Sequence, residues 1–255
     1  MIAGAEAARL RRALGSVADW ANETIVVIND DVADGTDRIA AEFGAKVFRE
    51  RWKGFGGQKN SAAAKAGSEW ILGLDADEVV SPELKREIQE LFAAPEKLRP
   101  FNAFSFPRCS LYCGRWIRHG DWYPDQKTLL WRGGNAHWGG VEPHAALIVN
   151  GAVGRLKGDL LHYSMENLNH HVLKTMDYSD IFARQRSGRK VGVLELWFRP
   201  WWRFVRGYIL RLGFLDGWQG YAVARLAAQE VFLRYAKIRE AKVTDAERSV
   251  LGPPV

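Results

Sequence analysis

The sequence predicts an α/β fold in which a mostly parallel sheet carries helices on both faces, with a helical region after it. Three observations predict this fold. Over the first hundred residues, helix and strand patterns alternate, which is typical of a parallel sheet. Two strand patterns end abruptly in polar and acidic residues, at the edge where such sheets bind ligands. Near residue 170 helical patterns resume and lead into a Pro-broken tail rich in Trp and Arg.

The elements of the first hundred residues follow from hydrophobic spacing and from capping residues. Over 5–21, one face of a helix carries Leu10, Leu14 and Val17. The elements expected next are a strand over 23–30, a helix over 34–44 closed by Gly44, a strand over 45–50, a helix over 56–67 and a strand over 70–74. Ser81 then caps a helix with Pro82 at its first position and a buried stripe of Leu84, Ile88, Leu91 and Phe92.

The chain of 255 residues is long enough for one large α/β domain with an appendage. Its net charge of +6 favours nucleotide phosphates, nucleic acid or an anionic membrane face as partner, although a hydrated basic surface fits equally well. Cys109 and Cys113 are too few for a disulfide framework, so we expect reduced packing residues of a cytosolic protein. We find no signal peptide and no run of about 18 uncharged apolar residues, so we expect nothing that spans a bilayer.

The sequence WILGLDADEVVSPELKREI, residues 70–88, places acids directly after an apolar run. Asp75 and Asp77 follow one strand, and Asn29 and Asp31 end another, so both strand ends point polar groups at one crevice. Carboxylate oxygens bind hard divalent cations such as Mg²⁺ or Mn²⁺, and such a cation can hold a diphosphate. As a bare tripeptide the pattern also fits loop or cap residues, but its place after a buried strand favours a binding site.

Three longer stretches resemble the family 2 glycosyltransferases, and among them the lipopolysaccharide-core β-1,4-glucosyltransferase group. They are WKGFGGQKNSAAAKAGSEWILGLDADEVVSPEL, GRWIRHGDWYPDQKTLLWR and GRLKGDLLHYS, and the resemblance runs from about residue 5 to 240. It implies a Rossmann-like GT-A fold, inverting sugar transfer and a role in lipopolysaccharide biosynthesis of the cell envelope. The implied donor is a nucleotide sugar, above all a UDP-hexose, and the implied acceptor is a lipid-linked or lipopolysaccharide-core saccharide.

The resemblance also implies roles for single residues. Asp75 and Asp77 would form a DXD motif that binds Mg²⁺ or Mn²⁺, and this metal would bridge the UDP diphosphate. Beside Asp75, the nucleotide-sugar contacts would come from Asn29, Asp31, Lys59 and Asn60. Asn29 stands where the family usually has Asp, so a hydrogen-bonding group is kept but its charge is lost.

Inverting transfer needs one general base, which removes the proton of the acceptor hydroxyl as that oxygen attacks the anomeric carbon. Asp125 in WYPDQK is our first choice, because it falls where the resembled family usually places its acceptor-side acid. Glu142 and His144 in GGVEPHAAL come next. Structural roles fit these residues equally well: Asp125 as a cap of the turn after Pro124, and His144 as a hydrogen-bonded core histidine.

We expect a catalytic domain over 1–165, a helical, membrane-associating region over 166–245 and a loose tail over 246–255. The resembled family opens with a strand that ends in a Lys-Asn-Glu-type turn, whereas only Met1 and Ile2 precede that region here. We therefore expect this strand to be missing and the true start to lie upstream, because its loss would leave backbone donors of the sheet unpaired.

The region beyond residue 194 has the composition of a helix that lies in a membrane interface. Its aromatic rings suit the headgroup zone and its basic residues suit anionic lipid. The aromatic residues are Trp197, Trp201 and Trp202, and the basic residues are Arg199, Arg203, Arg206 and Arg211. We expect a cytoplasmic protein, peripheral on the inner face of the cytoplasmic membrane, where a lipid-linked acceptor would meet it. Packing of these aromatic residues onto the catalytic domain is the alternative.

Three other functions stay open on sequence alone. LGLDADEV also resembles the haloacid-dehalogenase-type phosphatases, and GDWYPD mimics their later acidic motif. Their aspartyl nucleophile usually ends the first strand, however, whereas Asp75 follows at least two others. A nucleic-acid-binding protein would leave the acidic crevice unexplained, so we expect no nucleic acid partner. A catalytically inactive glycosyltransferase-like protein is compatible with the missing strand.

Overall fold

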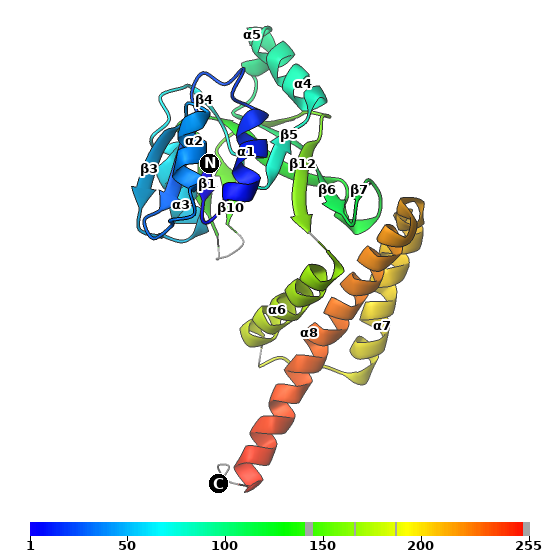
Figure 1. The fold of residues 1–255 in the computed structure, drawn as a ribbon. Coiled ribbons are helices and arrows are strands. Elements are labelled where there is room, and N and C mark those ends of the chain that lie inside the picture. The colour runs from blue at the N-terminus through cyan, green and yellow to red at the C-terminus, as the bar shows by residue number, and fades with distance from the viewer. Residues whose placement is uncertain (141–144, 166, 187, 252–255) are drawn as a thin grey trace. The chain divides into compact units, whose positions relative to one another are not determined.

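The computed structural model describes residues 1–140, 145–165, 167–186 and 188–251, of which 243–251 are described as backbone only. The chain forms two compact units (Figure 1): the first comprises Met1–Cys109 and Asp125–Tyr163, the second Ser110–Pro124 and Ser164–Val255. The domain boundary predicted at residue 165 lies close to Tyr163, where the chain passes for the last time from the first unit to the second. Ser110–Pro124 was expected in the catalytic domain but belongs to the second unit, because Tyr112 and Ile117 are buried there with Val223.

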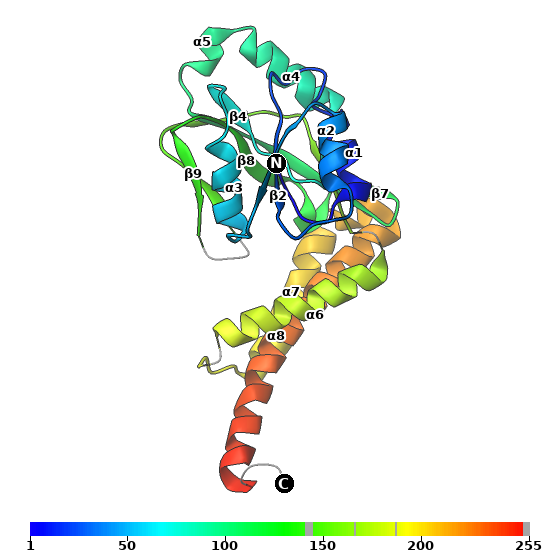
Figure 2. The same ribbon diagram turned by 60° about the vertical axis from the view of Figure 1, so that its left-hand side comes forward.

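A parallel sheet in the order β1-β2-β3 begins the first unit. Its strands are β1 (Ile2–Ala3), β2 (Ile25–Asn29) and β3 (Lys46–Glu50), and the helices around it are α1 (Ala7–Gly15), α2 (Thr36–Glu42) and α3 (Phe55–Ala63). Because β2 side chains alternate, Val26 and Ile28 pack with Leu10 of α1, whereas Val27 packs with Ala62 of α3 on the opposite face. Figure 2 shows α3 on one side of β2 and α1 and α2 on the other, as the sequence predicts.

The strand β1 corrects one expectation. Ile2 and Ala3 pair in parallel with Val27 and Ile28 of β2, where the sequence suggested that the strand is missing. The backbone N–H of Val27 also donates to the carbonyl oxygen of Met1, at 3.1 Å. The chain therefore supplies strand partners at this edge of β2, so a short strand stands where none was expected.

A larger sheet runs in the order β4-β8-β6-β12-β5, with β7 and β11 paired to β6. Its strands are β4 (Trp70–Leu72), β5 (Glu78–Val80), β6 (Ala103–Tyr112), β7 (Arg115–Ile117), β8 (Asp125–Arg132), β11 (Val153–Arg155) and β12 (Leu160–Met165). The pairs β4–β8, β6–β8, β6–β7 and β5–β12 are antiparallel. A separate antiparallel pair is formed by β9 (Ala136–Gly139) and β10 (Ala146–Val149).

The α/β class is therefore confirmed, but the larger sheet is mixed: β1–β2–β3 and the pair β6–β11 are parallel, whereas β4–β8, β6–β8, β6–β7 and β5–β12 are antiparallel. The alternation of helix and strand that predicted a parallel sheet ends near residue 100. Several later strands follow one another without an intervening helix. Two strands joined by a short turn pair antiparallel, because a parallel pair needs a longer crossover between them.

The helix α4 (Pro82–Phe92) begins as its sequence predicts. The hydroxyl of Ser81 accepts a hydrogen bond from the backbone N–H of Leu84, at 3.1 Å, and Pro82 occupies the first turn. Pro suits this position because its missing N–H would have no partner within the helix. The short helix α5 (Pro95–Leu98) follows it.

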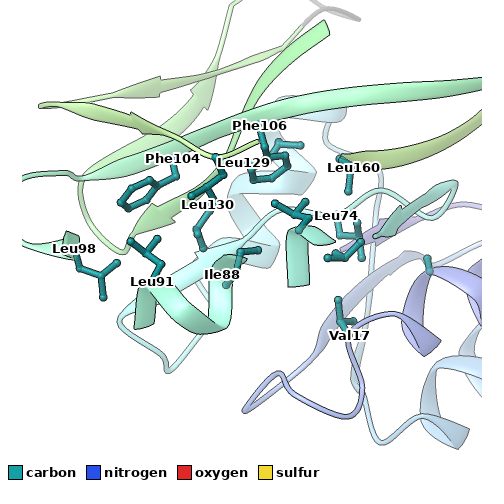
Figure 3. Packing of buried hydrophobic residues seen from close by; sticks show 14 of the residues in the cluster. Val17, Leu74, Ile88, Leu91, Leu98, Phe104, Phe106, Leu129, Leu130 and Leu160 are labelled. Carbon is teal, nitrogen blue, oxygen red and sulfur yellow. The ribbon is translucent and has the colours of Figure 1, made fainter. Parts of the chain in front are cut away.

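The main core of the first unit lies between α4 and the larger sheet. Figure 3 shows Ile88 and Leu91 of α4 close to Phe104 and Leu130 of the strands. Full burial of one such side chain stabilises the fold by roughly 1.5–3 kcal/mol. Phe92, predicted in the buried stripe, is instead 41% exposed. It lies at the edge of that stripe and packs edge-on against the Trp70 ring, with 5.9 Å between the ring centroids.

The second unit is mainly helical. Its elements are η1 (Gly120–Trp122), α6 (Leu168–Gln185), α7 (Val193–Phe204), a π-helical turn η2 (Val205–Leu210), η3 (Gly213–Asp216) and α8 (Gly217–Leu251). Both α6 and α7 pack along α8 (Figures 1 and 2). The described helices include none with a stretch long and apolar enough to cross a bilayer.

Two boundaries in the second unit differ from expectation. The helix α7 continues through Pro200, which was expected to break it. A Pro inside a helix removes one backbone hydrogen bond and crowds the preceding turn, a cost that the packing of α7 along α8 offsets. The helix α8 extends to Leu251, past the predicted start of the tail at 246, and the first helix-breaking residues in the sequence there are Gly252 and Pro253.

Candidate active site

An acidic turn joins β4 to β5. The backbone N–H of Glu78 donates to the carbonyl oxygen of Asp75 at 3.0 Å, and Glu78 Oε2 accepts from the backbone N–H of Asp75 at 3.1 Å. These two bonds close the turn. The side chains of Asp75 and Asp77 remain 38% and 27% exposed. Two accessible carboxylates therefore follow β4, where the sequence places them.

Lys59 of α3 brings a positive charge to this turn. Its Nζ lies 2.8 Å from Asp75 Oδ1 and 4.4 Å from the centroid of the Trp138 ring. The lysine is mostly buried, so its charge interactions are screened less than those of an open surface pair. The structure thus brings together Lys59 and Asp75, two of the residues predicted to contact the nucleotide sugar.

Asn60, the next residue, makes a different set of contacts. Its Nδ2 donates to the carbonyl oxygen of Trp138, and its Oδ1 accepts from the backbone N–H of Trp138, both at 2.8 Å. The amide therefore fastens β9 to α3 and holds Trp138 beside Lys59. A contact between Asn60 and a nucleotide stays a prediction.

Asp77 is held by the strand β12. Its carbonyl oxygen accepts from the backbone N–H of Tyr163 at 2.9 Å, and its Oδ2 lies 3.4 Å from His162 Nε2. Burial alone would raise the pKa of Asp77, but the hydrogen bond and charge of His162 outweigh it and lower the pKa below its ordinary value. Asp77 is therefore ionised at neutral pH, as a carboxylate that binds a cation must be.

Glu78 is the most deeply buried acid of this group, with 1% of its surface exposed. Burial, followed by the negative charge of Asp75, raises its pKa, while Arg108 opposes that rise. Arg108 Nη1 lies 3.2 Å from Glu78 Oε1. Glu78 was not predicted as a site residue. One feature could have marked it: Glu78 begins a strand at a position that faces the core, where an apolar residue is usual.

Asp125 stands opposite Arg108 in the register of β6 and β8. Arg108 Nε and Nη2 donate to Asp125 Oδ2 at 3.0 and 2.8 Å, and Lys127 Nζ lies 3.1 Å from Asp125 Oδ1. Because Arg108 also reaches Glu78, one guanidinium connects Asp125 to the acidic turn. The first-choice base, Asp125, is therefore connected through Arg108 and Glu78 to Asp75, one of the two predicted cation ligands.

The remaining predicted residues lie apart from this network or outside the described chain. Asn29, at the end of β2, has a buried Oδ1 without a hydrogen-bond partner among the described residues. Such an acceptor is costly unless a ligand or water supplies a donor. Asp31 is exposed just beyond it. Glu142 and His144 lie outside the described residues.

A cavity of about 650 Å³ adjoins the acidic turn within the first unit. Lys59, Asp75 and Glu78 line part of it, and most of the remaining wall is apolar, including Ile25 of β2 and Leu72 of β4. Apolar surroundings lower the local dielectric constant and so strengthen the interactions of these charges. The volume is within the usual range for small-molecule sites.

The chemistry of the acidic turn fits a hard divalent cation. Asp75 and Asp77 offer accessible carboxylate oxygens, and Mg²⁺ and Mn²⁺ prefer such ligands together with water and phosphate oxygens. Over the described residues, no group of three or more His, Cys, Asp and Glu side chains is arranged to hold a metal ion. A metal at this turn would therefore depend on substrate phosphate for further ligands.

Comparison with known proteins gives consistent relatives. The family model described as glycosyl transferase family 2 matches residues 1–153. An uncharacterised glycosyltransferase of Rickettsia typhi is 30% identical over 92% of this chain and 84% of its own length. A lipopolysaccharide core biosynthesis glycosyltransferase of Rhizobium meliloti, LpsC, is 26% identical over 87% of each chain.

Two crystal structures of S. aureus TarS also match this chain. One matches 91% of this chain and 53% of its own, at 14% identity and a TM-score of 0.46. A structure of TarS residues 1–349 matches 94% of this chain and 90% of its own, at 12% identity and the same TM-score of 0.46. The family model covers more than half of this chain, and the Rickettsia relative matches nearly all of it. The chain therefore belongs to glycosyltransferase family 2.

Proposed function

We propose that the protein transfers a sugar, with inversion at the anomeric carbon, from a UDP-hexose to a lipid-linked or lipopolysaccharide-core saccharide. Membership of the family makes it a glycosyltransferase, which implies a nucleotide-sugar donor and a saccharide acceptor. The finer proposal is supported above all by one observation. Asp75 is connected to Asp125 through Glu78 and Arg108, so a donor-side acid and an acceptor-side acid lie in one network.

On the donor side, Asp75 and Asp77 would hold Mg²⁺ or Mn²⁺, which supplies positive charge to the departing diphosphate. Lys59, already 2.8 Å from Asp75, pairs with a phosphate oxygen. Asn29 accepts a hydrogen bond from the N–H of uracil, which supplies the donor that its buried Oδ1 lacks among the described residues. Asp31 completes the contact with uridine.

On the acceptor side, Asp125 takes the proton of the acceptor hydroxyl while that oxygen forms a bond to the anomeric carbon. The bond between this carbon and the diphosphate breaks in the same step. The nucleoside diphosphate leaves with the bonding electrons, and the configuration inverts. Arg108 and Lys127 hold the Asp125 side chain in position before the acceptor binds. Glu142 and His144 are the alternative bases.

Two observations support an acceptor that is carried by a lipid. The relative LpsC is named for lipopolysaccharide core biosynthesis. In the second unit, α7 exposes large apolar side chains, with Leu194 83% and Trp197 77% exposed. Such residues favour the interface of a bilayer. Peripheral attachment to the inner face of the cytoplasmic membrane would bring a lipid-linked acceptor to the donor site.

Calorimetric titration of UDP into the whole protein tests the donor site, with and without Mn²⁺. We expect metal-dependent binding by the wild type and its loss in Asp77→Ala. Lys59→Met should weaken binding by roughly tenfold or more, because a charged hydrogen bond to phosphate is lost. Asp177→Ala is the matched control, since Asp177 is an exposed aspartate on α6.

The outcomes separate the active protein from an inactive relative. Metal-dependent binding leads to a screen of nucleotide sugars, with the anomeric configuration of the product read by NMR. A folded wild type that binds no nucleotide with either metal would favour a catalytically inactive glycosyltransferase-like protein. Equal binding by wild type and Asp77→Ala would remove the metal from the proposal. A product that retains the donor configuration would exclude direct displacement.

A further inference from the structure

A second cavity lies wholly within the second unit and is lined by residues of α6, α7, η2 and α8. Its volume is about 700 Å³. Four of its lining residues are arginines: Arg199, Arg203, Arg206 and Arg234. Most of the others are aromatic or aliphatic: Phe182, Leu194, Phe198, Trp202, Val231 and Tyr235. Nothing in the proposed transfer reaction uses this arginine pocket.

The arginines around this pocket outnumber the carboxylates that pair with them. Glu195 Oε1 lies 2.6 Å from Arg189 and 3.0 Å from Arg199, so one carboxylate serves two guanidiniums. Arg234 pairs with Glu230. These contacts alone leave one positive charge without a matching negative charge.

The imbalance is larger at Asp121, whose side chain is 5% exposed. Three guanidiniums surround it: Arg203 at 2.6 Å, Arg206 at 3.1 Å and Arg211 at 3.1 Å. In this group and the previous one, six arginines share three carboxylates. The arginine pocket and its immediate surroundings therefore carry an excess of three positive charges among these residues.

Some of these groups also lack hydrogen-bond partners. Arg206 Nε and Arg234 Nε are buried and have none among the described residues. Burial lowers the pKa of Arg203; Asp121 opposes this shift, and the positive charge of Arg206 adds to it. Concentrating like charges in a partly buried site is unfavourable, and an anion that accepts hydrogen bonds from them would offset the cost.

Three of these arginines lie over aromatic rings. The guanidinium carbons of Arg189 and Arg199 lie 5.2 and 5.0 Å from the centroid of the Tyr235 ring. That of Arg234 lies 4.9 Å from the Phe182 ring. Stacked guanidiniums are pre-organised, and their fork of donors matches the oxygens of a phosphate.

Apolar side chains continue from the pocket onto the surface of α7. Leu194, Phe198 and Trp202 line the pocket and are also exposed, and Trp197 and Trp201 extend the exposed surface along the same helix. A phosphate bound by the arginines would therefore have hydrocarbon-binding surface directly beside it. That combination suits an amphiphile rather than a free ion or a polar sugar phosphate.

We propose that the arginine pocket binds the phosphate headgroup of an anionic bilayer phospholipid, whose acyl chains lie along the exposed apolar side chains of α7. The excess of positive charge matches the anionic headgroup, and the aromatic residues match the interfacial zone of the bilayer. The proposal specifies the membrane contact of the proposed function and rests on it.

Co-sedimentation of the whole protein with vesicles tests the proposal. The probes are phosphatidylcholine vesicles with and without about 30% phosphatidylglycerol, which supplies the anionic headgroup. Arg206→Gln/Arg234→Gln should weaken binding to the anionic vesicles by roughly tenfold or more, since two arginines are lost. The control Arg225→Gln/Lys242→Gln removes the same charge from exposed residues of α8 and should bind as the wild type does.

A second variant changes only highly exposed side chains, so that a loss of vesicle binding does not reflect a loss of folding. Leu194→Ser/Trp197→Ser changes two highly exposed side chains and should also lose vesicle binding. Equal weakening by the arginine pair and its control would show unspecific charge attraction and overturn the proposal. Stabilisation of the wild type by inorganic phosphate alone, without binding to anionic vesicles, would overturn it in favour of a free-anion site.

Titration of UDP into the same variants separates this proposal from the proposed function. The nucleotide site lies in the first unit, and the arginine pocket lies in the second. We expect the arginine variants to keep UDP binding while they lose vesicle binding. Intact vesicle binding in a protein that binds no nucleotide would reject the donor site and keep the lipid site.

Discussion

Arg108 and Asp125 face each other across β6 and β8, and two nitrogens of Arg108 donate to the same oxygen of Asp125, at 3.0 and 2.8 Å. The third guanidinium nitrogen, Nη1, lies 3.2 Å from Glu78. A planar guanidinium serves two carboxylates in a fixed geometry, which the single ammonium of lysine does not. One side chain thus sets the relation between the acidic turn and the proposed base.

We expect Arg108→Gln to lower the free energy of unfolding by about 3–5 kcal/mol, because it leaves the buried Glu78 without its cation. Urea denaturation at neutral pH measures this change. The double variant Arg108→Gln/Glu78→Gln should recover part of the loss, since no buried charge then remains unpaired. Identical stability of the single and double variants would mean that Glu78 does not depend on Arg108.

Asp125→Asn should lower kcat by about 10²–10⁴-fold, because the amide cannot accept the proton of the acceptor hydroxyl. Its affinity for UDP should stay that of the wild type, since the proposed donor contacts are made by other residues. Steady-state kinetics with the donor identified by screening measures both quantities. Glu142→Gln and His144→Gln are the comparison variants. A comparable fall in kcat for one of them, with Asp125→Asn active, would transfer the role of base to that residue.

Asn60→Ala should destabilise the protein by about 1–3 kcal/mol, because it removes both hydrogen bonds to the backbone of Trp138. Asn60→Asp keeps the acceptor but loses the donor, so its stability at neutral pH should lie between that of the wild type and that of Asn60→Ala. Chemical denaturation measures the stability, and UDP titration measures the affinity. Unchanged stability with a large loss of UDP affinity would instead support direct contact between Asn60 and the nucleotide.

The buried His171 should make the stability of the second unit depend on pH. Its Nδ1 lies 3.0 Å from the Tyr112 hydroxyl, and burial, followed by the charge of Lys174, lowers its pKa from 6.5 to about 4. Between these two values the unfolded state binds a proton that the folded state does not. Stability should therefore be full above pH 6.5 and fall by up to about 3 kcal/mol as the pH decreases toward 4.

Denaturation at several pH values measures this dependence. His171→Gln should flatten the slope between pH 6.5 and about 4. The neighbouring His170→Gln should keep it, because His170 is less buried. An equal slope in wild type and His171→Gln would assign the pH dependence to other groups.

The sequence predicts those parts of the fold that depend on local pattern. The buried face of Leu10 and Leu14 and the cap of α4 at Ser81 each arise within one helix or one turn. Asp75 and Asp77 were predicted in the same way, since a short apolar run leads directly into them. In each case the deciding contacts lie within a few residues, so residue type and spacing suffice.

The residues that complete the site could not be predicted in this way. Arg108, Lys127 and His162 come from β6, β8 and β12. Only the pairing of these strands brings Arg108 and His162 to the acidic turn, while Lys127 pairs with Asp125. Their register depends on packing across the whole sheet rather than on spacing along the chain. His162 lay within the GRLKGDLLHYS stretch that carried the family resemblance, but nothing local marked it as the partner of Asp77.

The path from the backbone of Asp75 through Glu78 and Arg108 to Asp125 has a consequence for how donor and acceptor bind. A donor that neutralised Asp75 would relieve the repulsion felt by Glu78 and free more of the Arg108 charge for Asp125. Thermodynamic linkage is reciprocal, so an acceptor bound at Asp125 would tighten the donor by the same factor. Such coupling would raise the share of enzyme that holds donor and acceptor together, and lower the share that holds the donor alone and can lose it to wasteful hydrolysis.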